Sequence, residues 1–247
     1  MPIALSQGTP FIAGKGPENG KDSLERLRDE IISCRKCERL VNFREKIARE
    51  KTKRFVEQEY WGRPVPGFGS SDARLVVIGL APAAHGGNRT GRVFTGDLSA
   101  KFLMKELYDA GFANQPNSDN IGDGLELRDC YILAAVRCVP PDNIPTREEM
   151  QNCFPFLQRE LDLLKSARAI LLLGKIAFDS YVRYLKYYGI GMPAKMVFRH
   201  SNIYDLDDGR RVFASFHPSP RNTNTGNLTP DMFKKLLNSI REFIENG

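Results

Sequence analysis

Four of the five cysteines have a spacing that is typical of a metal or iron–sulfur site. Cys34 and Cys37 form a C-x2-C pair, and Cys138 and Cys153 follow much farther along the chain. A C-x2-C pair brings two thiolates to one centre, and two distant cysteines can complete a sulfur set for zinc or a four-iron cluster. The alternative is that Cys138 and Cys153 are small buried hydrophobic residues. The C-x2-C pair favours a metal, which four thiolates would enclose as a structural group, whereas Cys130 is predicted to be buried and inert.

A second candidate site is the glycine-rich segment 79–97, which follows an apolar run. Its glycines let backbone amides approach a ligand closely, and Arg89 and Arg92 suit a phosphate or a developing negative charge. Phe94 is suited to stacking on a planar base, although a phenylalanine in such a loop can equally join the core. Asp97 has two interpretations of equal weight, an N-cap for the next helix and a site residue. No dinucleotide fingerprint or P-loop is present.

The third candidate is the segment H-P-S-P at residues 217–220. Two prolines stiffen the backbone directly after an apolar run, so His217 is held at the end of a strand, where it suits a hydrogen-bond donor. His85 is interpreted as a loop contact and His200, in a charged stretch, as solvated. A serine hydrolase is disfavoured because no G-x-S-x-G elbow exists and Ser219 is only two residues from His217.

Alternating strand and helix patterns must position these segments. Short apolar runs predict four buried parallel strands at residues 75–80, 131–136, 169–173 and 212–216. Apolar residues three and four apart predict helices at residues 98–110, 147–164, 176–187 and 231–244. The pattern predicts an α/β fold, a single domain with a four-stranded parallel sheet flanked by helices. Ligands of such sheets bind beyond the carboxyl ends of the strands, where the segments 79–97 and 217–229 meet.

The N-terminal part is predicted to hold little regular structure. Residues 1–21 contain four glycines, three prolines and no periodic apolar pattern, which predicts a flexible segment ahead of a domain at 22–247. Asp22 and Glu25 resemble a capping box for a helix that leads to Cys34. A basic, irregular stretch is expected from there to Gly69.

Composition excludes a membrane protein and is compatible with a nucleic-acid partner. The longest apolar runs, such as residues 169–173, fall far short of the ~20 residues that a bilayer requires. No secretory signal is recognisable at the N-terminus, so a cytoplasmic location is expected. A formal net charge of +6 would help the chain bind a phosphate backbone, although many thermophilic enzymes carry a similar surplus.

Taken together, these segments resemble the uracil-DNA glycosylase superfamily, and in particular its family 5 (type B). Residues 81–92 match the family 5 form A-P-A-x-x-G-x-N-R-T-G-R of the first motif, and residues 212–220 resemble the second motif with its H-P-S-P. The resemblance covers about residue 33 to the C-terminus. It implies the superfamily's four-stranded parallel sheet, and it favours a structural [4Fe-4S] cluster over zinc on Cys34, Cys37, Cys138 and Cys153.

The resemblance implies a monofunctional DNA-repair glycosylase that flips uracil, and other deaminated bases, out of DNA and hydrolyses the N-glycosidic bond to leave an abasic site. Two departures matter. The first motif here has no polar side chain at residues 81–84 to position water, and residues 133–135 offer no asparagine to read the uracil edge, which implies a broader range of bases. A dissociative mechanism is expected, in which the base leaves as an anion before water adds.

Residue roles follow from the same resemblance. His217 and backbone amides of the first loop are expected to stabilise the departing base, and Asn88 and Asp97 to orient the base or the water. Arg221, beside Asn222, would fill the vacated stack or grip phosphates, or else be a solvated loop arginine. The expected substrate contacts are Ala81, Ala83, Ala84, Arg89, Phe94, Arg221 and Asn222.

The expected partner is DNA that contains uracil or another deaminated base. The chain is expected to act as a monomer at the nucleoid, with a sliding clamp as a further candidate partner. A rival hypothesis is a catalytically silent, metal-stabilised DNA-binding module, which the missing water-positioning residue supports. Phe94, His217 and the stiff H-P-S-P segment argue against it, and mutation of His217 would discriminate between the two.

Overall fold

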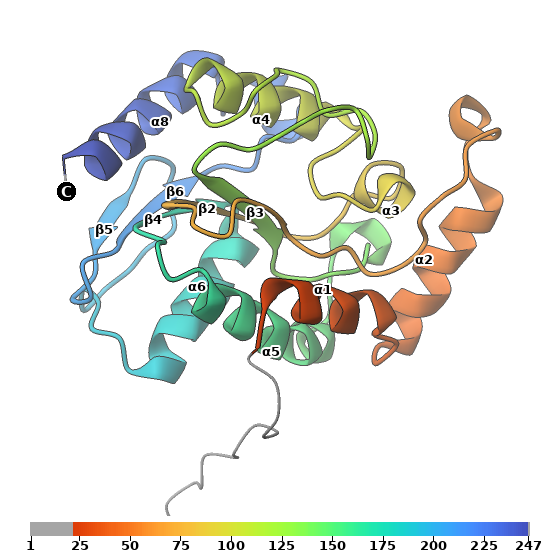
Figure 1. Ribbon diagram of the computed structural model, residues 1–247, viewed down its shortest axis with the longest axis horizontal. Coiled ribbons are helices and arrows are strands. Elements are labelled where there is room, and N and C mark those ends of the chain that lie inside the picture. Colours follow the sequence, from red (N-terminus) through yellow and green to blue (C-terminus); the bar gives the residue numbers. More distant parts are fainter. Residues whose placement is uncertain (1–21, 247) are drawn as a thin grey trace, which may run out of the picture.

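One mixed sheet organises the protein, whose computed structural model describes residues 22–246 (Figure 1). The predicted flexible segment 1–21 lies outside the described residues. The strand order is β1-β3-β2-β4-β6-β5. The four central strands are parallel, as predicted: β3 (Cys130–Ala134), β2 (Leu75–Gly79), β4 (Ala169–Leu173) and β6 (Arg211–Ser215). In their register, Val77 of β2 lies opposite Ile132 of β3 and Leu171 of β4.

Two short antiparallel strands extend the sheet from the predicted four strands to six. β1 (Phe68–Gly69) pairs with β3, and β5 (Ile203–Asp205) pairs with β6. The prediction missed them because neither strand contains an apolar run, and β5 alternates between exposed and partly buried residues. Such edge strands form because a neighbouring strand offers unpaired backbone groups, which local sequence does not reveal.

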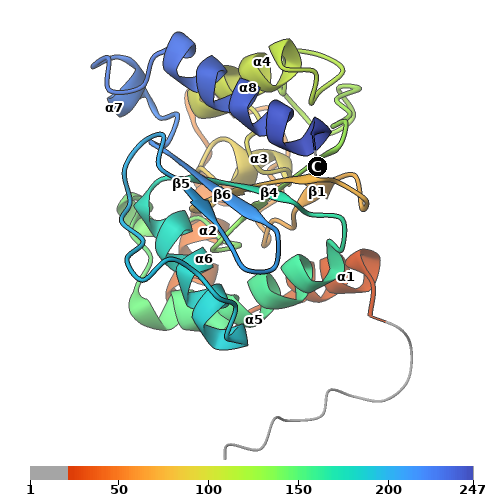
Figure 2. The same cartoon turned by 90° about the vertical axis from the view of Figure 1, so that its left-hand side faces the viewer.

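Helices cover both faces of the sheet (Figure 2). The first face is covered by α4 (Leu98–Asp109) and α8 (Pro230–Glu245), and the second by α5 (Arg147–Leu163) and α6 (Lys175–Tyr188), with α1 (Leu24–Ser33) against α5. Alternate residues of each central strand enter the two cores, which is why the strands are apolar throughout. In residues 22–246 no helix is long and apolar enough to cross a bilayer.

The region before β1 differs from the prediction. Residues expected to be irregular form α2 (Glu38–Glu50), whose buried positions are Leu40, Val41 and Arg44. An arginine inside this narrow stripe weakens its apolar periodicity, so the helix was missed. The N-cap of α1 is Ser23, which accepts a hydrogen bond from the backbone N–H of Arg26 at 3.2 Å, rather than the predicted Asp22.

Four short helical elements of the described chain lie in the segments that connect the longer helices and the strands. They are η1 (Lys53–Phe55), α3 (Gly87–Thr90), η2 (Pro141–Asn143) and α7 (Pro220–Thr223). α3 lies in the loop after β2 and α7 in the loop after β6, so both belong to the segments that sequence analysis selected. Figure 1 shows α2 beside α3, beyond the end of the sheet.

Candidate active site

The rings of Phe94 and His217 meet at the carboxyl edge of the sheet. Their centroids are 5.8 Å apart and their planes differ by 27°. Phe94 belongs to the loop after β2 and His217 follows β6, and parallel strands send both loops to one edge. A planar base between two rings needs about 7 Å, twice the usual contact distance between carbon atoms. A base can therefore stack on one ring and meet the other only at its edge, unless the rings separate.

Phe94 has a strained backbone conformation, and its ring occupies space that Gly79 leaves open. Its φ is 46°, in the left-handed region that bulky residues rarely adopt. A Cβ placed on Gly79 would lie 2.7 Å from Cε2 of the Phe94 ring, so the ring fits only because residue 79 has no side chain. Phe94 is partly buried against the core, and its ring also faces His217. Both interpretations of this residue therefore describe part of its surroundings.

His217 is held by its own loop. Its carbonyl oxygen accepts hydrogen bonds from the backbone N–H of Ser219 and from Nδ2 of Asn222, both at 2.8 Å. Burial lowers the pKa of His217 to about 4, so the imidazole is neutral at pH 7 and keeps one N–H donor. Asn222, predicted to touch substrate, has the observed role of fixing the histidine loop, whereas Arg221 is exposed on α7.

The first three alanines of the loop after β2 lie near the protein surface. Ala81, Ala83 and Ala84 are partly exposed. Within residues 22–246, the backbone N–H groups of Ala83 and Ala84 have no protein acceptor, whereas the Ala83 carbonyl accepts from Gly86 and Asn88. Two donors at a partly exposed turn are suited to binding an anionic oxygen.

Asp97 combines the two roles between which the sequence left a choice. One carboxylate oxygen accepts from the backbone N–H of Ala100 at 2.9 Å, so Asp97 is the N-cap of α4. The other oxygen lies against Gly86, where a Cβ would collide with it. Burial raises the pKa of this carboxyl group. The cap is established, and a role in chemistry remains a prediction.

Asn88 points into the protein rather than toward the edge of the sheet. Its side chain is 1% exposed, and Nδ2 donates to the backbone carbonyl of Arg44 on α2 at 3.2 Å. This hydrogen bond ties α3 to α2. The placement does not support the prediction that Asn88 contacts base or water directly.

The placement of Arg89 does not support the prediction that it binds substrate. Arg89 is 5% exposed, and its guanidinium donates to the His85 carbonyl at 2.8 Å, to Oε1 of Gln58 at 2.6 Å and to Oδ1 of Asn120 at 3.0 Å. Its plane also covers the Phe55 ring, with Cζ 4.2 Å from the centroid. The guanidinium is therefore occupied by partners from distant loops, which local sequence could not reveal.

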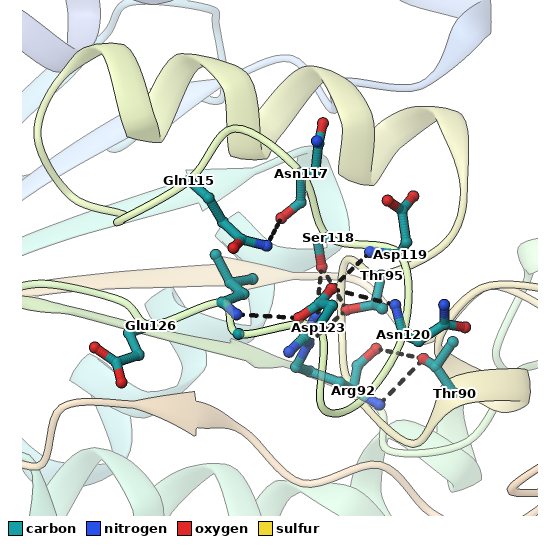
Figure 3. Close-up of polar contacts among 12 residues, drawn as sticks. Thr90, Arg92, Thr95, Gln115, Asn117, Ser118, Asp119, Asn120, Asp123 and Glu126 are labelled. Atoms are coloured by element: carbon teal, nitrogen blue, oxygen red, sulfur yellow. Dashed lines mark hydrogen bonds and ion pairs between the residues drawn. The ribbon is translucent and has the colours of Figure 1, made fainter.

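Arg92 is internal for the same reason. Asp123, in the loop between α4 and β3, accepts from Nη2 of Arg92 at 2.7 Å and from the backbone N–H groups of Asp119 and Asn120 (Figure 3). Nε of Arg92 donates to Thr95 Oγ1 at 2.9 Å. This loop, which sequence analysis did not consider, braces the segment that carries Phe94, and it leaves Arg92 unavailable for a phosphate.

His200 is also not solvated as predicted. Its ring stacks on Phe216, with centroids 5.4 Å apart and planes differing by 21°. Burial lowers its pKa, and within the described part of the chain its Nε2 is buried without a partner. His200 therefore packs against Phe216, the residue that follows β6, and stabilises the end of that strand.

The four predicted metal ligands line one pocket. Cys34 caps the end of α1, Cys37 the start of α2, Cys138 follows β3 and Cys153 lies in α5. Ala81, in the loop after β2, packs against the buried cluster that includes Cys138 and Cys153, so the pocket adjoins this loop. Within residues 22–246, no three Cys, His, Asp or Glu residues are close enough to hold one metal ion. The predicted burial of Cys130 is confirmed, in the core of the other face.

Two buried arginines accompany the cysteines. Nη1 of Arg44 donates to Sγ of Cys138 at 2.9 Å, and Arg137 forms an ion pair with Glu160 at 2.5 Å. Nε of both arginines lacks a hydrogen-bond partner among the described residues. Burial raises the pKa of Cys138 to about 12 and of Cys153 to about 11, so thiolates there need bound cations. Four sulfur donors with spare N–H donors nearby fit a metal–sulfur group that carries net negative charge.

The chain is similar in sequence to known proteins along most of its length. The family model described as the uracil DNA glycosylase superfamily matches residues 66–241. The type-5 uracil-DNA glycosylase of Thermus thermophilus is 46% identical over 207 residues, 84% of this chain and 92% of the relative. That of Pyrobaculum aerophilum is 44% identical over 209 residues, 85% and 88% of the two chains. The type-4 uracil-DNA glycosylase of Thermotoga maritima is 28% identical over 182 residues, 73% and 83%.

Proposed function

This chain belongs to the type-5 group of the uracil-DNA glycosylase superfamily, and we propose that its uracil binds where Phe94 and His217 meet. Enzymes of this kind act in DNA repair and hydrolyse the N-glycosidic bond between uracil and deoxyribose, which leaves an abasic site. The observation that carries the proposed location is the 5.8 Å ring pair at the carboxyl edge of the sheet. The damaged nucleotide must leave the duplex to reach it, at a cost of a few kcal/mol that is least for a mispaired base.

The chemistry at this place is stabilisation of a departing anion. As the glycosidic bond breaks, the base takes the bonding electrons and its oxygens gain negative charge. Neutral His217 and the free backbone N–H groups of Ala83 and Ala84 are the proposed donors to those oxygens, and one such donor typically contributes ~3 to 4 kcal/mol. Phe94 stacks on the face of the base. The enzyme is proposed to be monofunctional, because this scheme uses water and no protein nucleophile.

Water addition and base range are proposed from the same surroundings. Asp97 is the carboxyl group in the first loop and is our candidate for orienting the water that adds to the sugar cation. Residues 133–135 after the start of β3 are apolar and buried, so no side-chain amide there reads the edge of uracil. We therefore expect the enzyme to accept other deaminated bases as well.

The cysteine pocket is proposed to hold a [4Fe-4S] cluster. Zinc is the less favoured occupant, because the cysteine sulfurs would have to move together to bind a single ion. Such a cluster, when bound, joins α1, α2, α5 and the segment after β3 and carries a net negative charge that Arg44 and Arg137 offset. Its proposed role is structural. Because Ala81 packs on the pocket, the cluster also supports the backbone of the first loop.

The proposed partner is DNA, and the catalytic unit is a monomer acting on chromosomal DNA at the nucleoid. Arg221, exposed on α7 only four residues from His217, is the proposed contact to the strand from which the base is flipped. A sliding-clamp contact remains a prediction.

The test is single-turnover excision on a duplex that carries one uracil opposite guanine. Wild type should release uracil and leave alkali-labile sites, His217→Ala should be slower by about 100-fold or more, and Asn224→Ala, an exposed change in the same loop, should retain wild-type rate. Tight DNA binding without release of any deaminated base would instead support the silent binding module.

A further inference from the structure

The first loop contains a polar side chain that the scheme above does not use. Residues 81–84 carry no polar side chain, and His85 is the next residue along the chain. It lies directly after Ala83 and Ala84, whose backbone N–H groups are the proposed donors to the departing base. Any function for His85 toward DNA rests on the proposed function.

Tyr60 holds the His85 ring in one position. Oη of Tyr60 lies 3.0 Å from Nδ1 of His85, and the two rings pack edge to face with centroids 6.0 Å apart. Tyr60 itself is 7% exposed. The backbone beside it is anchored, because the N–H of Trp61 donates to the Arg89 carbonyl at 2.8 Å and Arg89 in turn donates to the His85 carbonyl. Both the ring and the backbone of His85 are therefore fixed.

The contact also favours one of the two neutral forms of the His85 ring. Among residues 22–246, the Tyr60 hydroxyl has no partner other than His85, so donation to Nδ1 is the hydrogen bond by which its proton is satisfied within the described protein. Burial, with the positive charge of Arg89 as the second cause, lowers the pKa of His85 and favours the neutral ring. A neutral ring that accepts at Nδ1 is protonated at Nε2.

The Nε2 donor is left without a protein partner. No acceptor in the described part of the chain bonds to it, and it is not among the fully buried polar atoms that lack a partner, so it remains open to solvent. A rigid, neutral donor that is open at one end is suited to an external acceptor.

We propose that His85 donates a hydrogen bond from Nε2 to an anionic oxygen of the DNA substrate, and that Tyr60 is its positioning residue. Two substrate groups share this chemistry, a backbone phosphate and the departing base. His85 thereby supplies a polar contact in a loop whose preceding residues offer only backbone.

Two substitutions distinguish the roles of the two ring nitrogens of His85. His85→Gln keeps an N–H near the place of Nε2, whereas His85→Asn keeps a polar group beside Tyr60 and loses the distal donor. With the cluster-loaded protein, His85→Asn should lower either DNA affinity or the single-turnover rate by about 10- to 100-fold, the usual range for a hydrogen bond to a charged acceptor, and His85→Gln should recover most of it. Tyr60→Phe should cause a loss of about 3- to 10-fold.

Two substrates then identify the acceptor. A phosphate contact predicts weaker binding to a duplex with a tetrahydrofuran abasic analogue and equal losses for uracil and 5-fluorouracil. A contact to the base predicts unchanged binding and a smaller loss of rate for 5-fluorouracil, whose anion needs less stabilisation. The proposal is overturned if His85→Asn matches wild type in both affinity and rate, or if Asn and Gln variants lose equally with a lowered melting temperature. Failure of wild type to release uracil would refute the proposed function, and the affinity comparison would still test the contact.

Discussion

Replacement of Gly79 by alanine should impair the ring pair while leaving the fold intact. Gly79 ends β2, and its carbonyl accepts from the backbone N–H of Ala135 at 2.9 Å. A Cβ there would lie 2.7 Å from Cε2 and 2.9 Å from Cζ of Phe94. Carbon atoms in contact prefer about 3.5 to 4.0 Å, so the ring must move by about 1 Å. The backbone of Gly79 has no positive φ, so alanine fits its conformation.

The size of the effect follows from what the ring loses. Overpacking of this kind costs about 1 to 3 kcal/mol of folding free energy, and the lower end is expected because Phe94 is only partly buried and can move outward. Stacking of a base on an aromatic ring contributes about 1 to 3 kcal/mol. Loss of that contact in the transition state corresponds to a rate lowered by about 5- to 150-fold.

The assay is single-turnover uracil excision together with thermal unfolding, on a double-mutant cycle with Phe94→Ala. If the collision with the ring is the cause, Gly79→Ala should have almost no further effect once the ring is gone, within about 0.5 kcal/mol. An equal loss with and without the ring would refute the collision. Full activity of Gly79→Ala alone would refute the placement of the base on Phe94.

Three further predictions test the remaining assignments. Burial lowers the pKa of His217 to about 4 from an ordinary 6.5, so the unfolded chain binds the proton more readily. The free energy of unfolding should therefore fall by up to about 3 kcal/mol as pH drops from about 6.5 toward 4. Urea titrations should show a smaller fall for His217→Asn, and an equal fall would contradict the assignment. Cys153→Ala should lose iron and its visible absorption, while Cys130→Ala, in the other core, should keep both. Iron analysis of the purified variants checks this, and full iron retention by Cys153→Ala would exclude Cys153 as a ligand. Arg89→Lys should lower the free energy of unfolding by about 2 kcal/mol or more without changing the salt dependence of DNA binding. Arg221→Ala should leave the stability unchanged and reduce by about 1 the slope of log affinity against log salt concentration. The opposite pattern in binding titrations would restore Arg89 as a phosphate ligand.

The central strands could be predicted because their burial is complete. A strand covered by helices on both faces must be apolar at every position, so β2, β3, β4 and β6 appear in the sequence as uninterrupted runs. α2 lacked such a signal, because Arg44 occupies the centre of its buried stripe and serves the cysteine pocket. The two edge strands were missed because their pairing, not their composition, creates them.

The part of the site that depends on the direction of the strands could be predicted from the sequence. Parallel strands place the loops after β2 and β6 at one edge, so Phe94 and His217 could be expected to meet. The role of Gly79 could not be predicted, because a glycine at the end of an apolar run does not indicate that its missing side chain makes room for the Phe94 ring. Tyr60 gave none either, because nothing in its neighbours indicates a contact with His85.

The sequence by itself determined the four central strands with the helices that follow them, the two loops at the carboxyl edge and the four cysteines. Only the tertiary structure decided which polar side chains remain available there. Arg89 and Arg221 both lie in polar loops, yet Arg89 is enclosed by Gln58 and Asn120 from other segments and Arg221 is exposed. The physical reason is that hydrophobic periodicity is a local property of the chain, whereas the burial and hydrogen-bond partners of a side chain depend on segments that approach it only in the folded protein.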